Sequence, residues 1–164
     1  MLINLCRAIA KISPKLVPTE RQVGIASKKE GPPLSDTEII SIVDDDASAR
    51  SAAARLVQAL GWQARTFSSG EEFLQSSHLS QTCCLITDVQ MPRLNGLDLQ
   101  SRLNGQSRRI PVIFMTAFSE TSVQAKAMAA GAVCYLTKPL DATTLEQCIR
   151  LALDQRSQQR LENK

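Results

Sequence analysis

Residues 39–46 carry the sequence IISIVDDD, in which a short and almost wholly apolar run leads directly into three aspartates. The apolar run is too short for a helix and nearly continuous in hydrophobicity, as expected for a strand that is buried on both faces. Similar short runs follow at residues 64–67, 83–87, 112–116 and 134–137. The sequence therefore predicts five buried strands.

Amphipathic segments separate these runs. Apolar residues repeat at helical spacing between the first two runs (Ala53, Leu56, Val57, Leu60) and after the last (Leu145, Cys148, Ile149, Ala152). A capping box of Ser69 and Glu72 predicts a second helix, and weaker patterns predict a third over residues 97–103 and a fourth over 121–130. Asp141 is a suitable N-cap for the fifth. Five alternations of strand and helix predict an α/β fold with a doubly wound, five-stranded parallel sheet and five helices.

Polar side chains stand at the carboxyl ends of four of these strands, although the strands themselves are apolar. They are Asp44, Asp45 and Asp46 after the first strand, Asp88 after the third, Thr116 closing the fourth and Lys138 after the fifth. In such a sheet, ligands bind at this edge, where the strand order reverses. Clustered carboxylates repel one another unless a cation neutralises them, and Mg²⁺ suits carboxylate oxygens combined with phosphate. The pattern predicts a magnesium-assisted phosphoryl-transfer site with a carboxylate nucleophile, either Asp88 or Asp44.

Four motifs resemble the receiver domain of bacterial two-component response regulators. They are IISIVDDD (39–46), ITDVQMPRLNG (86–96), VIFMTA (112–117) and YLTKP (135–139), in the family's order and approximate spacing. The resemblance covers residues 38–154, and AGAVCYLTKP (130–139) is most similar to the FixJ-like subgroup. It implies a flavodoxin-like receiver fold that works in phosphorelay signal transduction.

The resemblance implies a phosphorylation site and a metal site that share one carboxylate. Asp88 matches the aspartate that takes a phosphoryl group from a histidine kinase. Mg²⁺ would be held by Asp44, Asp45, Asp88 and the main-chain carbonyl of Gln90, while Asp46 matches a variable neighbour. No turnover of an outside substrate is expected, only self-phosphorylation and self-dephosphorylation, so the chain is not expected to be an enzyme.

The resemblance also assigns a switch. Thr116 and Lys138 match the groups that stabilise the phosphoryl oxygens, and Pro139 matches a proline that follows a cis bond. Thr116 would move toward the phosphoryl group and Tyr135 would turn into the vacated space. This remodels the face made by the fourth helix, fifth strand and fifth helix. Glycine at position 96 is expected to supply a positive φ before the third helix.

The implied partners are a sensor histidine kinase or phosphotransfer protein, and a downstream protein target on that face. A phosphorylation-dependent homodimer is a further expectation. Three alternatives remain open: a docking module that is indifferent to phosphate, a truncated DNA-binding transcription regulator, and a haloacid-dehalogenase-type phosphatase with Asp44 as nucleophile. Phosphatases of the last kind need a pair of acidic residues after their lysine, and no such pair follows Lys138 in this sequence.

The charge and the cysteines describe the rest of the chain. Residues 1–37 hold six basic and three acidic residues with four prolines, which predicts a poorly ordered basic extension. Residues 155–164 form a polar basic tail without an output domain, so no direct contact with nucleic acid is expected. No long apolar segment is present, and a cytoplasmic location is expected. Five cysteines without a CxxC pair predict reduced, structural thiols.

Overall fold

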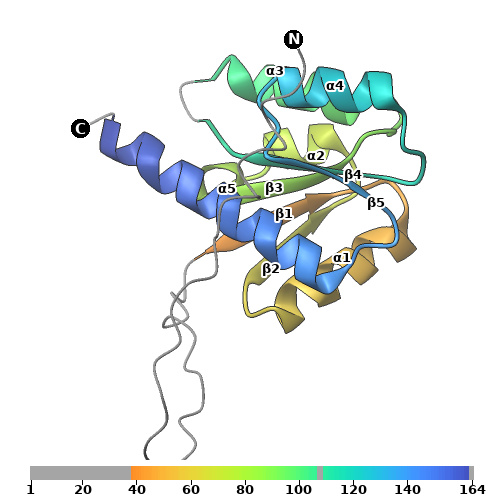
Figure 1. Cartoon of the computed structure of the whole chain (residues 1–164), viewed down its shortest axis with the longest axis horizontal. Helices are drawn as coiled ribbons and strands as arrows, with labels where there is room; N and C mark the ends of the chain where they lie inside the picture. Colours follow the sequence, from red (N-terminus) through yellow and green to blue (C-terminus); the bar gives the residue numbers. More distant parts are fainter. Residues whose placement is uncertain (1–37, 107–108, 163–164) are drawn as a thin grey trace, which may run out of the picture. The chain divides into compact units, whose positions relative to one another are not determined.

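The computed structural model describes residues 38–106 and 109–162, in which five parallel strands alternate with helices (Figure 1). The strands are β1 (Ile39–Val43), β2 (Gln63–Phe67), β3 (Thr82–Asp88), β4 (Val112–Thr116) and β5 (Cys134–Thr137). They pair in the order β2-β1-β3-β4-β5. The predicted doubly wound fold is confirmed. The predicted extension at residues 1–37 lies outside the described residues.

Five α-helices connect or follow the strands. They are α1 (Ala47–Ala59), α2 (Gly70–Gln75), α3 (Gly96–Asn104), α4 (Thr121–Ala129) and α5 (Ala142–Glu162). A short 3-10 helix, η2 (Leu79–Gln81), precedes β3 and was not expected from the sequence. Helix α5 continues well past residue 154, so most of the predicted tail is helical.

The core forms two layers because successive side chains of a strand point to opposite faces of the sheet. On one face, Ile42 of β1 packs with Val57 of α1 and Ile149 of α5. On the other face, Leu85 of β3 belongs to a cluster with Leu99 of α3. Helices α1 and α5 thus cover one face, and α2, α3 and α4 cover the other (Figure 1).

Helix ends agree with the sequence pattern except in one detail. Gly61 and Gly131 have φ of 98° and 91°, the left-handed conformation that ends α1 and α4. At α2, the Ser69 hydroxyl accepts a hydrogen bond from the Glu72 N–H at 3.1 Å. The Glu72 carboxylate bonds the N–H of Ser68, at 2.7 Å, instead of the N–H of Ser69 that a capping box would use.

Glycine at position 96 is needed for space, and the expectation of a positive φ there is wrong. Asn95 is the N-cap of α3, and the positive φ in this loop, 64°, belongs to Arg93. A Cβ on Gly96 would clash with the main-chain oxygen of Asp88 and lie 2.9 Å from Phe114 Cε1. The glycine therefore lets α3 begin directly against the end of β3.

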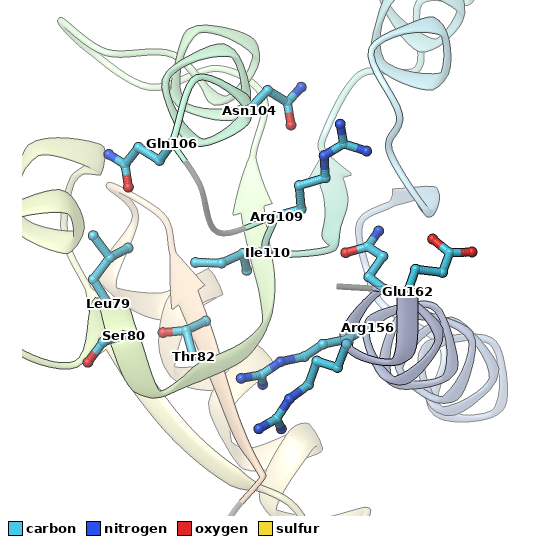
Figure 2. A pocket seen from close by; sticks show the side chains of 11 residues that line it. Leu79, Ser80, Thr82, Asn104, Gln106, Arg109, Ile110, Arg156 and Glu162 are labelled. Carbon is cyan, nitrogen blue, oxygen red and sulfur yellow. The ribbon is translucent and has the colours of Figure 1, made fainter. Parts of the chain in front are cut away.

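The two ends of the sheet differ in charge. At the end where β3 and β4 begin, a cleft of about 720 Å³ is lined mostly by polar residues, which include Arg109, Arg156 and Arg160 (Figure 2). Glu162 is the one acidic residue among those that line it. The opposite end carries Asp44 and its neighbours, described next. No helix among the described residues is long and apolar enough to cross a membrane.

Candidate functional site

Strand register brings the predicted site residues to one edge of the sheet. Val43 pairs with Thr87, so the residues that follow them, Asp44 and Asp88, are neighbours at the ends of β1 and β3. Thr116 pairs with Thr137, which places Lys138 directly beyond the end of β5. The peptide bond between Lys138 and Pro139 is cis. The tertiary fold thus joins carboxylates from two strands to an ammonium group from a third.

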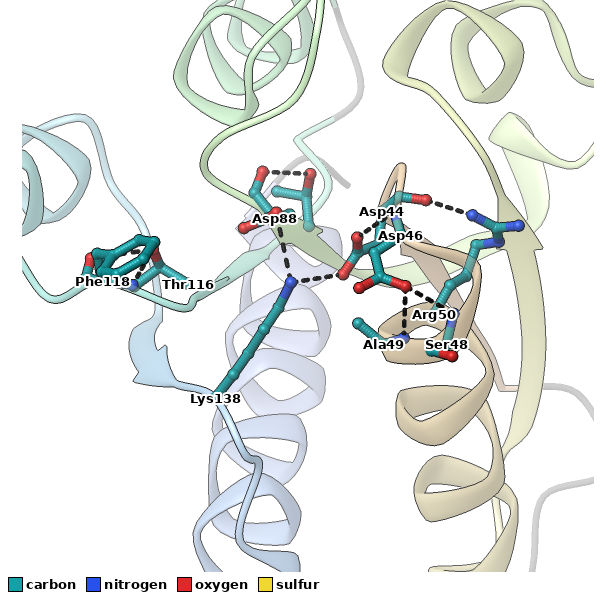
Figure 3. Close-up of polar contacts among 10 residues, drawn as sticks. Asp44, Asp46, Ser48, Ala49, Arg50, Asp88, Thr116, Phe118 and Lys138 are labelled. Atoms are coloured by element: carbon teal, nitrogen blue, oxygen red, sulfur yellow. Dashed lines mark hydrogen bonds and ion pairs between the residues drawn. The ribbon is translucent and has the colours of Figure 1, made fainter.

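Lys138 connects two carboxylates at this edge. Its Nζ donates a hydrogen bond to Asp44 Oδ2 at 2.8 Å and lies 3.3 Å from Asp88 Oδ2 (Figure 3). The Asp44 side chain has no exposed surface, and that of Asp88 is 11% exposed. Figure 3 shows the Lys138 side chain reaching from the end of β5 to both aspartates. A buried negative charge of this kind requires a cationic partner.

Asp44, Asp45 and Asp88 form a cluster that suits a divalent cation. One carboxylate oxygen from each lies within 4.8 Å of the others. Asp45 is exposed, whereas the other two are buried. Oδ1 of Asp88 is buried and has no hydrogen-bond partner among the described residues. An unpartnered buried oxygen beside two further carboxylates fits a hard cation such as Mg²⁺, which prefers oxygen ligands.

The protonation equilibria reflect this crowding. Burial raises the pKa of the Asp88 carboxyl above its usual range, although the Lys138 ammonium acts in the opposite direction. The Asp44 carboxylate adds to the increase. Burial alone would lower the pKa of Lys138, but its hydrogen bond to Asp44 and the charges of both aspartates outweigh burial and raise it. Lys138 therefore stays protonated, and added negative charge near Asp88 is disfavoured without a cation.

The third aspartate, Asp46, has a structural role that sequence reasoning missed. It is the N-cap of α1, and its Oδ1 accepts hydrogen bonds from the N–H groups of Ser48 and Ala49 at 2.8 and 3.3 Å. Arg50, one turn into α1, donates to the Asp44 main-chain oxygen at 2.6 Å. The position of Asp46 before an alanine-rich helix is the signal that could have identified it as a cap.

Thr116 is not directed at Asp88 in this structure. Its hydroxyl donates to the Phe118 carbonyl at 3.0 Å and accepts from the Phe118 N–H at 3.2 Å, which closes the turn after β4 (Figure 3). Burial raises the pKa of Tyr135. A hydrogen bond with the nearby Thr116 side chain lowers this pKa and offsets part of the increase. The Phe118 side chain is 68% exposed beside the site. The two expected switch residues thus interact with each other, and the Thr116 hydroxyl is bonded to Phe118 and not to Asp88.

Two cysteines differ from expectation. Cys134 of β5 and Cys148 of α5 form a disulfide, with their Cα atoms 6.0 Å apart. The prediction that these residues are reduced thiols is wrong, because the packing of α5 on β5 brings together two cysteines that are 14 residues apart. Cys83 and Cys84 are buried free thiols, as predicted.

Comparison with protein families gives one match that covers most of the described residues. The family model for the response regulator receiver domain matches residues 40–150. The chain is 39% identical over 128 residues to response regulator protein TodT of Pseudomonas putida, which covers 77% of this chain and 56% of that protein. It is 31% identical over 116 residues to transcriptional regulatory protein FixJ of Bradyrhizobium diazoefficiens, covering 71% and 57%. The chain therefore spans about half the length of these relatives.

A solved structure agrees with these sequence matches. The crystal structure of a response regulator receiver protein from Burkholderia phymatum has a TM-score of 0.61 and 39% identity to this chain. The match covers 71% of this chain and 95% of that one. Fold and sequence similarity therefore point to the same family.

Proposed function

Because the chain belongs to the response regulator receiver domain family, we propose that Asp88 accepts a phosphoryl group from a phosphohistidine of a partner protein. The receiver domain is the signal-receiving part of a two-component system, and its family is a signalling domain, not a typical enzyme family. The observation that supports Asp88 is its access to solvent: its side chain is 11% exposed, whereas that of Asp44 has no exposed surface.

The alternative nucleophile, Asp44, is hydrogen-bonded through both carboxylate oxygens. Its Oδ1 accepts a hydrogen bond from the Asp46 N–H at 2.9 Å, and its Oδ2 accepts one from Lys138. Two hydrogen bonds reduce the free acceptor capacity of Asp44, and its side chain has no exposed surface, whereas that of Asp88 is 11% exposed. This geometry favours Asp88 and disfavours the haloacid-dehalogenase-type reaction with Asp44.

In the proposed transfer, a carboxylate oxygen of Asp88 attacks the phosphorus of the phosphohistidine. A phosphorus–oxygen bond forms, and the phosphorus–nitrogen bond breaks. Its electron pair returns to the imidazole nitrogen, which can take up a proton. In a second displacement, water attacks the phosphorus of the acyl phosphate, the bond from phosphorus to the Asp88 oxygen breaks, and its electron pair restores the carboxylate as inorganic phosphate leaves. Both steps modify Asp88 of this chain, and in this proposal the chain turns over no further substrate.

Lys138 and the acidic residues provide the electrostatics. The Lys138 ammonium, already 3.3 Å from Asp88 Oδ2, is in position to neutralise an oxygen of the incoming phosphoryl group. Asp44, Asp45, Asp88 and the main-chain carbonyl of Gln90 would hold Mg²⁺. When bound, Mg²⁺ supplies positive charge that offsets the carboxylates and the phosphoryl oxygens. Asp45 is the exposed member of the set and leaves access from solvent.

Thr116 and Tyr135 form the proposed switch. A phosphoryl group on Asp88 would offer the Thr116 hydroxyl an acceptor that competes with the Phe118 carbonyl. Movement of Thr116 would remove a contact of Tyr135 and change the face formed by α4, β5 and α5. That face would bind the downstream target or a second copy of the chain. The proposal includes a cytoplasmic location, which fits phosphotransfer from a sensor histidine kinase.

The partner that donates the phosphoryl group would cover an apolar groove beside Lys138. This groove, about 740 Å³ in volume, lies between α1 and the start of the β5–α5 connection and is lined by Ala52, Leu56, Pro139 and Lys138 among others. Because Lys138 contacts Asp88, a protein that brings a histidine to Asp88 would lie against this groove. Ala52→Glu should slow transfer from a phosphorylated protein and leave phosphorylation by acetyl phosphate unchanged.

The central experiment is phosphorylation with acetyl phosphate and Mg²⁺, followed by intact-protein mass spectrometry. The parent chain should gain one phosphoryl group, and Asp88→Asn should gain none. Asp154→Asn, which changes an exposed aspartate of α5, is the matched control and should behave as the parent. Phosphorylation that survives in Asp88→Asn but is lost in Asp44→Asn would assign the nucleophile to Asp44. No incorporation, combined with no response to beryllofluoride, would favour the docking module.

A further inference from the structure

The Cys134–Cys148 disulfide joins the two elements on which the proposed signalling face depends. Cys134 is the first residue of β5, and Cys148 lies on the buried side of α5 between Leu145 and Ile149. Their Cα atoms are 6.0 Å apart, a usual separation for a disulfide.

The loop closed by this disulfide contains groups of the phosphorylation site. Tyr135 follows Cys134 directly, and Lys138 lies three residues further, between the two cysteines. Lys138 in turn bonds Asp44 and approaches Asp88. The disulfide therefore restrains the strand and helix that flank the ammonium group, in the arrangement where Lys138 is paired and Thr116 is bonded to Phe118.

The two sulfur-bearing residues differ in access to solvent. Cys148 is 5% exposed and belongs to the core cluster beneath α1 and α5. Cys134 is partly exposed and packs at the margin of the same cluster. Thiol–disulfide exchange with a small molecule would therefore take place at Cys134, with Cys148 as the partner that forms or releases the bond.

We propose that Cys134 and Cys148 are a reversible redox modification site that controls how readily the receiver accepts its phosphoryl signal. Disulfides in reducing compartments are usually transient or redox-sensing, which fits a pair placed beside a switch. The oxidised form stabilises the resting arrangement and weakens the response, and reduction releases β5 and α5. This inference rests on the proposed function.

The oxidant in this reaction is a small-molecule disulfide such as oxidised glutathione. The Cys134 thiolate attacks one glutathione sulfur, forms a mixed disulfide and releases the first glutathione thiolate. The Cys148 thiolate then attacks the Cys134 sulfur and releases the second. Two electrons pass from the protein to glutathione, and the two protons lost by the cysteines are taken up by the two glutathione thiolates. The reverse reaction restores both thiols.

Linkage makes the proposal quantitative. If the disulfide weakens binding of a phosphoryl analogue by a given factor, the bound analogue must disfavour oxidation by the same factor. We expect this factor to be about fivefold or more, the lower end of typical coupling between two sites. The same number should thus be obtained from two independent titrations.

The experiment uses the full chain, beryllofluoride and Mg²⁺. Residues 127–150, between Lys126 and Arg150, hold both cysteines in one tryptic peptide, so the disulfide is detected as the loss of two hydrogen atoms. Trp62 fluorescence is used to follow α5, because the Arg150 guanidinium of α5 lies 5.7 Å from the Trp62 ring. Affinity for beryllofluoride is measured in oxidised and reduced protein. The ratio of oxidised to reduced peptide is measured in glutathione buffers with and without beryllofluoride.

The variants separate the disulfide from general effects of oxidation. Cys148→Ala should bind beryllofluoride as the reduced parent does in every buffer. Cys134→Ser should behave in the same way. Because position 134 is only partly buried, this second variant keeps the test valid if Cys148→Ala fails to fold. The matched control is Cys83→Ala, which removes a free thiol of β3 and should keep the response to glutathione.

The outcomes distinguish this inference from the proposed function. Equal affinities in the oxidised and reduced forms would overturn the redox inference and leave phosphorylation of Asp88 intact. A peptide that keeps both thiols in every glutathione buffer would overturn it as well. If the reduced parent does not bind beryllofluoride although the disulfide forms reversibly, the proposed function is wrong, and the redox inference is overturned with it.

Discussion

Lys138 Nζ lies 2.8 Å from Oδ2 of Asp44, a carboxylate whose side chain has no exposed surface. The two residues are 94 positions apart, at the ends of β5 and β1. This ion pair joins strands that are not neighbours in the sheet, since β3 and β4 lie between them. It therefore connects the ends of the first and last strands at the proposed phosphorylation site.

Removal of the cation from this pair should destabilise the protein strongly. Lys138→Met leaves Asp44 buried without its charged partner, and loss of one member of a buried ion pair costs about 3 kcal/mol or more. Urea denaturation at neutral pH without divalent cations measures the change in the free energy of unfolding. The control, Lys126→Met, alters an exposed lysine of α4 and should change it by no more than about 0.5 kcal/mol. Similar values for the two variants would contradict the role given to Lys138.

Asp88→Asn should stabilise the metal-free protein at neutral pH. Burial raises the pKa of Asp88 in the folded state above its ordinary value of 3.8, so the ionised form opposes folding. This cost is full above the raised folded pKa and absent below the unfolded value. The gain from Asn should thus shrink as the pH falls and vanish below about 3.8. Urea denaturation across this pH range tests the sign, and a variant that is less stable than the parent at neutral pH would contradict it.

The neighbouring aspartates Asp45 and Asp46 should respond differently to substitution, although both are exposed. Asp45→Asn should lower Mg²⁺ affinity at least about tenfold, since even indirect partners of a metal site contribute that much. Asp46→Asn should leave Mg²⁺ affinity and stability unchanged, because asparagine is an equally good N-cap. Isothermal titration with Mg²⁺ provides the comparison. Equal losses in the two variants would mean that general negative charge, rather than ligation by Asp45, holds the ion.

Asp46→Ala extends this test to stability. Loss of the cap at the start of α1 should lower the free energy of unfolding by about 1 kcal/mol and leave Mg²⁺ binding unaffected. Thermal unfolding with and without Mg²⁺ measures both effects. A loss of Mg²⁺ stabilisation in this variant would place Asp46 among the ligands.

Gly96→Ala should be destabilising and Gly105→Ala should not. A methyl group at position 96 would clash with the Asp88 main-chain oxygen and crowd Phe114, and overpacking of this kind costs about 1–3 kcal/mol. At position 105, the nearest atom to an added Cβ lies 3.6 Å away, an ordinary contact. Urea denaturation compares the two. If Gly96→Ala is as stable as the parent, the end of β3 is more adaptable than the structure indicates.

Most of the fold could be predicted from local sequence because it is encoded in short patterns. Continuous apolar runs identified the strands, and all five overlap the observed ones, with β1, β4 and β5 matching in both bounds. The alternation of strand and helix predicted a parallel sheet, because parallel strands require crossover connections. The short helix η2 and the non-standard capping contact of Glu72 were missed, since both depend on how one loop packs.

The sequence by itself determined which chemical groups reach the carboxyl edge of the sheet, because each follows a strand that its own residues define. It also identified Asp44, Asp45, Asp88 and Lys138 as one set. Only the tertiary structure decided which atoms of this set are in contact. The Lys138 ammonium contacts Oδ2 of Asp44 and Oδ2 of Asp88, and Oδ1 of Asp88 has no hydrogen-bond partner among the described residues. The disulfide of Cys134 with Cys148 was decided in the same way, since it depends on how α5 lies against β5. Contacts between residues far apart in the chain follow from packing geometry, which local patterns do not contain.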